Sequence, residues 1–272
     1  MAGGKLSNRQ KMINLMYLVF IAMIAMQMSK EVLSAFGYMN EKLSENNISI
    51  ESKNQSILSN LATKASEQPE KYKSLHDVAS SINNISNEYN SYLENKKNEF
   101  LEDKEDKKDY EVMDQTDIVD AHFFAGDGYT EAGQEFLDKI NSYRDDVIKL
   151  IGENNPLTAG IKKRFDTSDK KIDELSSEPW LQNRYKGFPL ISSVTNLTAI
   201  QTDIKNTQAD IFSSLLGGQL ESDVSMSNYR TILIPEKSAF FQGENFKGKI
   251  VLGRYDSSLQ PSEVVVNGTK IT

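Results

Sequence analysis

An uninterrupted apolar segment near the N-terminus constrains this chain more than any other feature. Leu15 to Met26 contains no charged or strongly polar residue, and Ile13 and Met28 extend it at its two ends. The seventeen residues from Met12 to Met28 would rise about 25 Å as an α-helix, slightly less than the roughly 30 Å of a bilayer's hydrocarbon core. We therefore predict a single transmembrane helix there.

The orientation of this helix follows from the charges around it. Lys5, Arg9 and Lys11 precede the apolar run, and acidic residues follow it, so the positive-inside rule places residues 1–11 in the cytoplasm and the bulk of the chain outside it. A cleaved signal peptide is the alternative, because the basic residues resemble a leader region. No Ala-x-Ala step follows the run, which favours an uncleaved anchor.

Beyond the anchor, apolar residues recur at helical spacing and predict a helical bundle over residues 37–222. We expect the anchor helix to continue without a break as far as Phe36, in one segment covering residues 12–36. The other predicted helices begin after Pro69, near Val112, at Thr130, near Asn154 and near Pro189. The helix from Thr130 is predicted to bury the face that carries Phe136, Ile140, Tyr143, Val147, Ile148 and Ile151. The helix from Asn154 is predicted to include Ile161, Phe165, Ile172 and Leu175, and the last helix to end at Gly217 and Gly218.

The pattern changes to short β-rich runs after Ser222. The runs are Tyr229 to Ile234, Phe246 to Leu252 and Val264 to Val266. Three or four strands are too few for a β-sandwich, which usually needs about seven. The predicted fold class is therefore mainly α: a single N-terminal transmembrane helix, a helical bundle, and the truncated beginning of a β-sandwich-like domain over residues 223–272.

Composition excludes several classes of function. The formal charge is -8 and no Lys or Arg cluster is interleaved with aromatics, which argues against nucleic acid as a partner. The chain has no cysteine, no HExxH and no Gly-x-Ser-x-Gly motif. The nearest approach to a metal constellation is Asp117, Asp120, His122 and Asp127, whose spacing fits neither an EF-hand nor a known zinc pattern. We expect no enzymatic activity, no cofactor and no metal.

The residues at the cytoplasmic end of the anchor carry the remaining chemistry. Met12 to Met28 contains no Asp or Glu, so any proton carried through the membrane must be carried by a partner. Arg9 lies before the span, and Asn14 and Tyr17 lie within it. A guanidinium beside a partner's buried carboxylate would favour its ionised form and so gate proton uptake. The plain alternative is that Arg9 and Lys11 only set the topology.

The N-terminal segment also resembles a known family. The opening MAGGKLSNRQKMINLMYLVFIAM, with SKEV from Ser29 and AF at Ala35, closely resembles the GldM/PorM family, inner-membrane proteins of gliding motility and type IX secretion in Bacteroidetes. The layout that follows, helices and then strands, agrees with that family. The resemblance implies a bacterial inner-membrane location with a periplasmic bulk.

The resemblance further implies a molecular motor. Such proteins are homodimers whose transmembrane helices sit inside a pentameric ring of a GldL-like two-span protein, which supplies an intramembrane Glu and uses the proton-motive force. Arg9 is then expected to face that carboxylate, with Asn14 and Tyr17 as weaker contacts, and Lys11 remains a topology signal. The periplasmic part reaches outer-membrane-associated components through C-terminal domains that are mostly missing here.

Two other classes of function use the same features. A passive membrane-anchored periplasmic scaffold of a secretion complex would need the same anchor and the same helices. An envelope enzyme or ligand-binding sensor is the third class, and it would depend on His76, His122 or the segment from Asp117 to Asp127.

Overall fold

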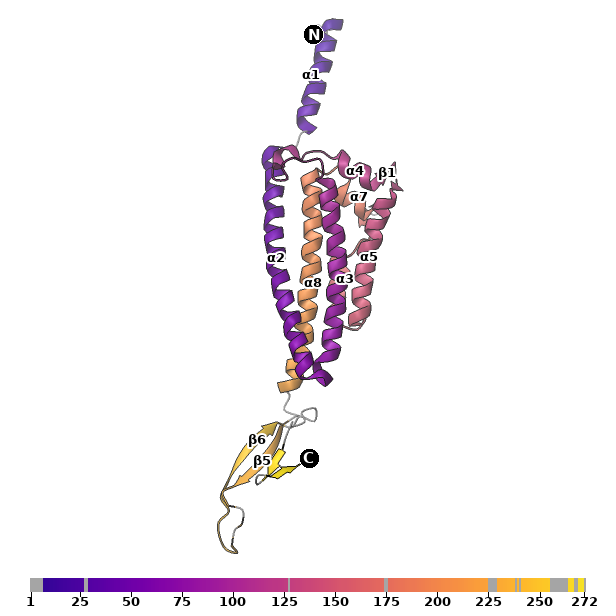
Figure 1. Cartoon of the computed structure of the whole chain (residues 1–272). Helices are drawn as coiled ribbons and strands as arrows, with labels where there is room; N and C mark the ends of the chain where they lie inside the picture. Colours follow the sequence, from indigo (N-terminus) through magenta and orange to yellow (C-terminus); the bar gives the residue numbers. More distant parts are fainter. Residues whose placement is uncertain are drawn as a thin grey trace. The chain divides into compact units, whose positions relative to one another are not determined.

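The computed structural model describes residues 7–26, 29–126, 128–173, 176–224, 229–237, 239, 241–254, 264–266 and 269–271. These residues form a mainly helical protein with a few two-stranded sheets (Figure 1), as the sequence predicts. The chain divides into two compact units, residues 1–51 with 84–206 and residues 52–83 with 207–272. Three long helices contribute to both units: α2 (Lys30–Glu67), α3 (Pro69–Phe100) and α8 (Leu190–Val224).

Helix α1 (Asn8–Met26) covers most of the predicted anchor. The prediction of one unbroken helix through Phe36 is wrong, because Ser29 is not helical and caps α2, accepting the Val32 N–H at 3.4 Å through its hydroxyl. Within the described ranges, no helix combines the length and the apolar character needed to cross a membrane. The span predicted from Met12 to Met28 therefore finds no support in these helices, and residues 27–28 lie outside the described part of the chain.

The shorter elements of the first unit connect α3 to α8. They are the 3-10 turn η1 (Tyr110–Val112), α4 (Asp117–Phe123), the hairpin of β1 (Phe124–Ala125) with β2 (Gly128–Tyr129), α5 (Glu131–Ile151), α6 (Thr158–Arg164), the hairpin of β3 (Lys170–Lys171) with β4 (Ser177–Glu178), and α7 (Trp180–Tyr185). The predicted helix starts at Pro69 and Thr130 are confirmed. Thr130 caps α5 by accepting the Gly133 N–H at 3.0 Å.

An aromatic cluster forms the core against which α3, α4, α5 and α7 pack. The Phe123 and Phe136 rings lie 5.0 Å apart between centroids, and the fully buried Tyr185 ring packs edge-on against both. Burial raises the pKa of Tyr185 and Tyr143 well above the ordinary tyrosine value. The buried face predicted for α5 is confirmed except at its end, since Phe136, Ile140, Tyr143, Val147 and Ile148 are buried and Ile151 is half-buried.

Two helix ends differ from the prediction. The helix expected near Asn154 is only α6, which stops at Arg164 because the Asp166 carboxylate accepts the Ser168 N–H at 2.9 Å and turns the chain. Ile172 is accordingly 63% exposed, and Leu175 lies outside the described residues. Helix α8 does not end at Gly217 and Gly218 but runs to Val224, since one glycine costs a helix only about 1 kcal/mol relative to alanine.

The strands predicted after Ser222 are confirmed as two antiparallel hairpins. β5 (Tyr229–Pro235) pairs with β6 (Gly248–Arg254), and β7 (Val264–Val266) pairs with β8 (Thr269–Ile271). Ile232, Leu233 and Ile250 are between 48% and 73% exposed, so both faces of the larger hairpin present apolar side chains to solvent.

Candidate functional site

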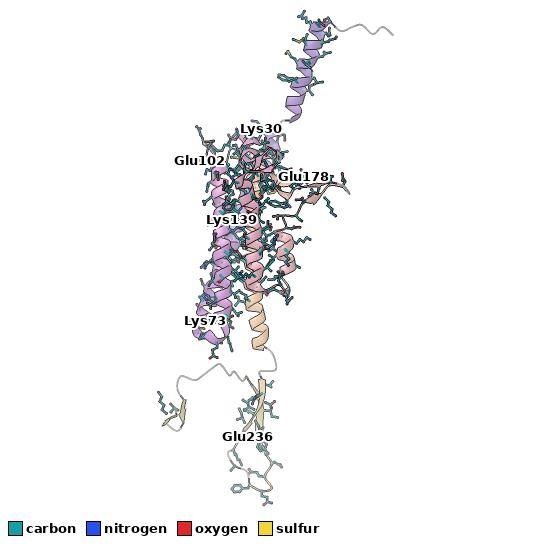
Figure 2. All side chains as sticks on the ribbon, turned by 90° about the vertical axis from the view of Figure 1, so that its right-hand side faces the viewer. Lys30, Lys73, Glu102, Lys139, Glu178 and Glu236 are labelled. Atoms are coloured by element: carbon teal, nitrogen blue, oxygen red, sulfur yellow. The ribbon has the colours of Figure 1, made fainter. Side chains whose placement is uncertain are left out.

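The three residues predicted to contact a membrane partner all lie on α1. Arg9, Asn14 and Tyr17 are exposed, Tyr17 by 70%, and Figure 2 shows the α1 side chains standing out from the helix. Within the described part of the chain, none of the three side chains has a hydrogen-bond or ion-pair partner. Helical geometry places Asn14 and Tyr17 about 60° apart around the axis, and Arg9 about 140° from Asn14. The structure puts them on one helix but does not bring them together.

The rest of α1 presents an apolar surface. Met12, Leu15, Met16, Leu18 and Phe20 are between 61% and 71% exposed. The exposed apolar residues continue around the helix and occupy no single stripe, as expected of a helix whose surroundings are apolar on several sides. This surface begins directly after the basic residues Arg9 and Lys11.

A second polar arrangement, which we call the polar seam, lies where α8 meets α2 and α3 in the first unit. Figure 1 shows the α8 ribbon between those of α2 and α3, and hydrogen bonds join it to both. The polar seam consists of Thr195, Thr198, Gln201, Thr202 and Lys205 of α8, Asn40, Ser44, Asn47 and Glu51 of α2, and Asn90, Glu94 and Lys97 of α3.

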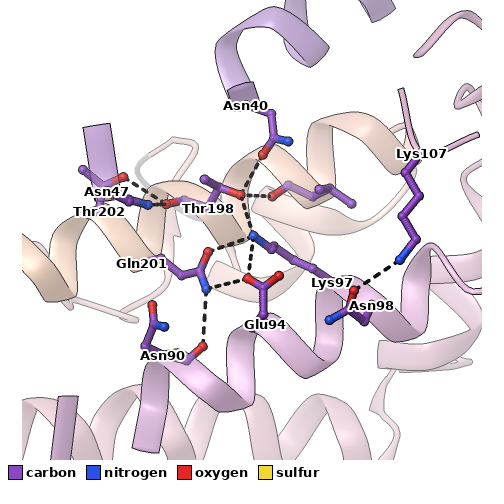
Figure 3. Close-up of polar contacts among 11 residues, drawn as sticks. Asn40, Asn47, Asn90, Glu94, Lys97, Asn98, Lys107, Thr198, Gln201 and Thr202 are labelled. Atoms are coloured by element: carbon purple, nitrogen blue, oxygen red, sulfur yellow. Dashed lines mark hydrogen bonds and ion pairs between the residues drawn. The ribbon is translucent and has the colours of Figure 1, made fainter. Parts of the chain in front are cut away.

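Lys97 holds the α3 side of the seam together (Figure 3). Its side chain is 13% exposed, and its ammonium donates to Glu94 Oε2 at 2.8 Å, Gln201 Oε1 at 2.9 Å and Thr198 Oγ1 at 3.4 Å. Burial by itself would raise the pKa of Glu94, but hydrogen bonds from Lys97 and Gln201 outweigh burial and hold this pKa below its ordinary value. The glutamate is therefore ionised at neutral pH.

The α2 side of the seam is joined by hydroxyl and amide groups and by one ion pair. Thr198 Oγ1 lies 2.7 Å from Asn40 Oδ1, and the Asn47 amide donates to the Thr198 carbonyl at 3.4 Å. Lys205, whose side chain is 11% exposed, pairs with Glu51 at 2.5 Å. Most of these contacts are between side chains on different helices, so they join α8 laterally to its neighbours.

A groove of about 400 Å³ opens beside the seam and is lined almost entirely by polar side chains from the three helices. Asn47 Oδ1 and Asn90 Oδ1 are buried and, within the described ranges, accept no hydrogen bond. These two amide oxygens of the seam are therefore acceptors for which the described residues provide no donor.

Asp120 and His122, two of the residues that came nearest to a metal pattern in the sequence, take part in other contacts. His122 Nε2 lies 3.2 Å from Lys96 Nζ and His122 Nδ1 lies 3.4 Å from Glu99 Oε1, while both Asp120 oxygens accept the Gly187 N–H. Burial and the Lys96 ammonium lower the pKa of His122, against an opposite effect of Glu99. Of the residues the structure describes, no three His, Asp or Glu side chains gather closely enough to hold a metal ion, and Asp127 lies outside them.

Sequence reasoning missed the polar seam, although a signal was present. The apolar residues Leu190, Val194, Leu197 and Ile204 mark the buried stripe of α8. Thr198, Gln201 and Lys205 recur at intervals of three and four among them, which is the helical repeat of a buried face. Apolar periodicity alone does not reveal such a face, because its buried residues are polar.

Comparison with known families covers most of the chain. The family described as GldM N-terminal domain matches residues 31–218, and the family described as GldM second domain matches residues 220–272. No curated protein matches the chain closely enough to count as a relative. Because the first of these matches alone covers more than half of the chain, the protein belongs to the GldM family and has a role in the machinery of gliding motility and type IX secretion.

Proposed function

We propose that this chain is the single-span subunit of a membrane motor driven by the proton-motive force. In this proposal the segment from Met12 to Met28 anchors the protein in the inner membrane, residues 1–11 are cytoplasmic, and the remainder is periplasmic. Two copies form a homodimer inside a ring of a GldL-like two-span protein. The protein has no enzymatic step of its own, and it transmits rotation or a conformational change across the periplasm.

The exposed apolar surface of α1 is the observation that carries this proposal. Met12, Met16 and Phe20 are each more than 60% exposed, and exposing such a surface to water is unfavourable at roughly 25 cal/mol per Å². Lipid or partner helices around α1 would remove that cost. The described helix includes Arg9 and Lys11 and is short for a span, so a ring of partner helices suits it better than lipid alone.

Arg9 is the residue proposed to couple the subunit to protons. Its exposed guanidinium stands at the polar end of the apolar surface, where a buried carboxylate of the ring could meet it. The pairing would hold that carboxylate ionised until a movement separates the two groups. Asn14 and Tyr17 are proposed as weaker contacts with the same ring.

Arg9→Ala tests the coupling, with Lys11→Ala as the matched control. The proposal expects Arg9→Ala to abolish motility and secretion while the complex still assembles, and Lys11→Ala to retain both. Native mass spectrometry after co-expression with the two-span partner should find two copies of this chain with five partner subunits. Normal secretion and gliding in Arg9→Ala cells would remove Arg9 from the mechanism.

A passive scaffold remains the competing function, and it makes an opposite prediction. A scaffold should keep its conformation and its contacts with outer-membrane-associated components when a protonophore dissipates the proton gradient. The motor proposal expects a change in protease sensitivity of the periplasmic helices under the same treatment. Identical cleavage patterns with and without the protonophore would favour the scaffold.

A further inference from the structure

The chain around η1 contacts the starts of two long helices. We call residues 108–115 the clasp. Its first part, Lys108 to Glu111, contacts the beginning of α2 through side chains. Its second part, Met113 to Gln115, contacts the first residues of α8 through backbone carbonyls. The clasp and both helix starts belong to the first unit, so the clasp connects two helix starts that lie far apart in the sequence.

Tyr110 is the centre of the contact with α2. The residue is only 7% exposed, and its ring lies against the backbone of α2 at Gly37, where a Cβ would stand 2.0 Å from Tyr110 Cδ2. No side chain fits into that space. Glycine is less favourable than alanine inside a helix, so the close approach of the ring is the reason for glycine at this position.

Polar contacts hold the clasp to α2 on either side of Gly37. The Tyr110 hydroxyl donates to Glu41 Oε1 at 2.9 Å, and Lys108 Nζ lies 3.5 Å from the same oxygen. About three turns earlier on α2, Lys30 Nζ donates to Glu111 Oε2 at 3.1 Å. Lys30 and Glu111 are both more than half exposed, so their pair contributes little. The buried Tyr110 side chain is therefore the main connection.

The start of α8 depends on the carbonyls of the clasp. The first N–H groups of a helix have no partner within the helix itself. Here the Leu190 N–H donates to the Gln115 carbonyl at 2.8 Å, and the Ile191 N–H donates to the Met113 carbonyl at 3.4 Å. Leu190, Ile191 and Met113 are at most 1% exposed. Water cannot replace these carbonyls there, and a buried N–H without an acceptor is costly.

The two parts of the clasp are joined by a single turn. The Met113 N–H donates to the Tyr110 carbonyl at 3.1 Å, which closes the 3-10 turn η1. The Tyr110 side chain is buried against α2, and the Met113 side chain is fully buried. Because both residues of this short turn are held by packing, a displacement of Tyr110 moves the Met113 carbonyl with it.

We infer that the clasp transmits a displacement of the first turns of α2 to the N-terminus of α8, with the contact between Tyr110 and Gly37 as the link that carries it. Helix α2 begins at Lys30, shortly after α1 ends at Met26, so its start follows the proposed anchor directly in the sequence. The inference deepens the proposed function and rests on it for the source of the displacement. The coupling itself requires neither a ring nor protons.

Hydrogen–deuterium exchange of the full-length chain in detergent, measured by mass spectrometry, tests the coupling at a distance. Gly37→Ala places a methyl group where the Tyr110 ring lies, although residue 37 is not among the partners of the Leu190 and Ile191 N–H groups. The variant should raise the exchange rate severalfold in the clasp and at the start of α8. Exchange in the buried part of α5, from Ile140 to Val147, should not change.

Gly160→Ala is the matched control, because a Cβ there meets no atom of the described residues within 4 Å. It should leave exchange at the start of α8 as in the wild type. Unchanged exchange at the start of α8 in Gly37→Ala would overturn the inference. An equal acceleration in α5 would also overturn it, since the variant would then act through a general loss of stability.

Tyr110→Ala supplies a second variant that adds no clash. It should accelerate exchange at the start of α8 in the same way, even if Gly37→Ala does not fold. In the Tyr110→Ala background, Gly37→Ala should add little, because the ring atoms that the methyl group would meet are gone. Such non-additivity is expected only of residues that act through one contact. Independent, additive effects of the two substitutions would overturn the inference.

Secretion separates this inference from the proposed motor function. If both hold, Gly37→Ala cells should secrete less than Gly160→Ala cells. If exchange at the start of α8 responds to Gly37→Ala but Arg9→Ala cells secrete normally, the motor proposal fails while the coupling stands. If exchange there does not respond and Arg9→Ala cells do not secrete, the coupling fails while the motor proposal stands.

Discussion

Single side chains in the polar seam contribute unequally, according to their burial and the number of their partners. Lys97 is 13% exposed and donates to three acceptors on two helices. Lys108 is 78% exposed and only approaches Glu41 at 3.5 Å. Hydrogen bonds to charged groups contribute more when water cannot replace them, so these two lysines provide a direct comparison at the residue scale.

Lys97→Met should lower the free energy of unfolding by about 1 to 3 kcal/mol, because it removes hydrogen bonds to a charged donor and keeps the aliphatic volume. Lys108→Met should change the same quantity by less than about 1 kcal/mol. Urea denaturation followed by circular dichroism measures both. Equal losses in the two variants would show that the Lys97 contacts add nothing beyond an exposed ion pair.

His122 should make stability depend on pH in a predictable direction. Its pKa is lowered from the ordinary value of 6.5, chiefly by burial and then by Lys96, so below pH 6.5 the unfolded chain binds a proton that the folded chain resists. Stability is therefore fully present above pH 6.5 and falls as the pH drops below it. Urea midpoints at pH 7.5 and pH 5.5 should differ more for the wild type than for His122→Gln, and equal differences would count against this assignment.

Close backbone contact between elements governs the packing of α4 against α5. A Cβ on Gly133 would lie 2.3 Å from the Phe123 carbonyl oxygen, which the Thr130 N–H holds in place at 3.1 Å. Gly133→Ala should therefore lower stability by about 1 to 3 kcal/mol, the usual cost of overpacking. Gly160→Ala in α6 meets nothing within 4 Å and should raise stability by up to about 1 kcal/mol. Thermal unfolding of both variants measures the contrast, and a stabilised Gly133→Ala would contradict it.

At the scale of the whole molecule, α1 should decide whether the chain is found in the membrane fraction or in the supernatant. We expect the full chain to remain in the membrane fraction after an alkaline carbonate wash, because its exposed apolar side chains need lipid or partner helices. A chain beginning at Ser29 should appear in the supernatant with its helical circular dichroism intact. If the full chain is also washed off, the anchor proposed for residues 12–28 does not hold.

Local pattern was sufficient to predict much of the architecture. The start of α3 at Pro69, the Thr130 cap and the buried face of α5 follow from interactions within a few residues of each other, as do β5 and β6. The ends of α6 and α8 were predicted wrongly, because an Asx turn at Asp166 stopped one helix, while glycine costs a helix too little to stop the other at Gly217. Neither outcome can be read from apolar periodicity.

The sequence by itself determined the mainly helical class, the apolar N-terminal segment with its basic start, the change to strands after Ser222 and the resemblance to the family that the chain matches. Only the tertiary structure decided that α8 meets α2 in parallel and α3 in the opposite direction, and that Thr198, Gln201 and Lys205 lie inside the bundle. The physical reason is that periodicity shows which residues share a helix face, whereas their partners come from segments up to 159 residues away.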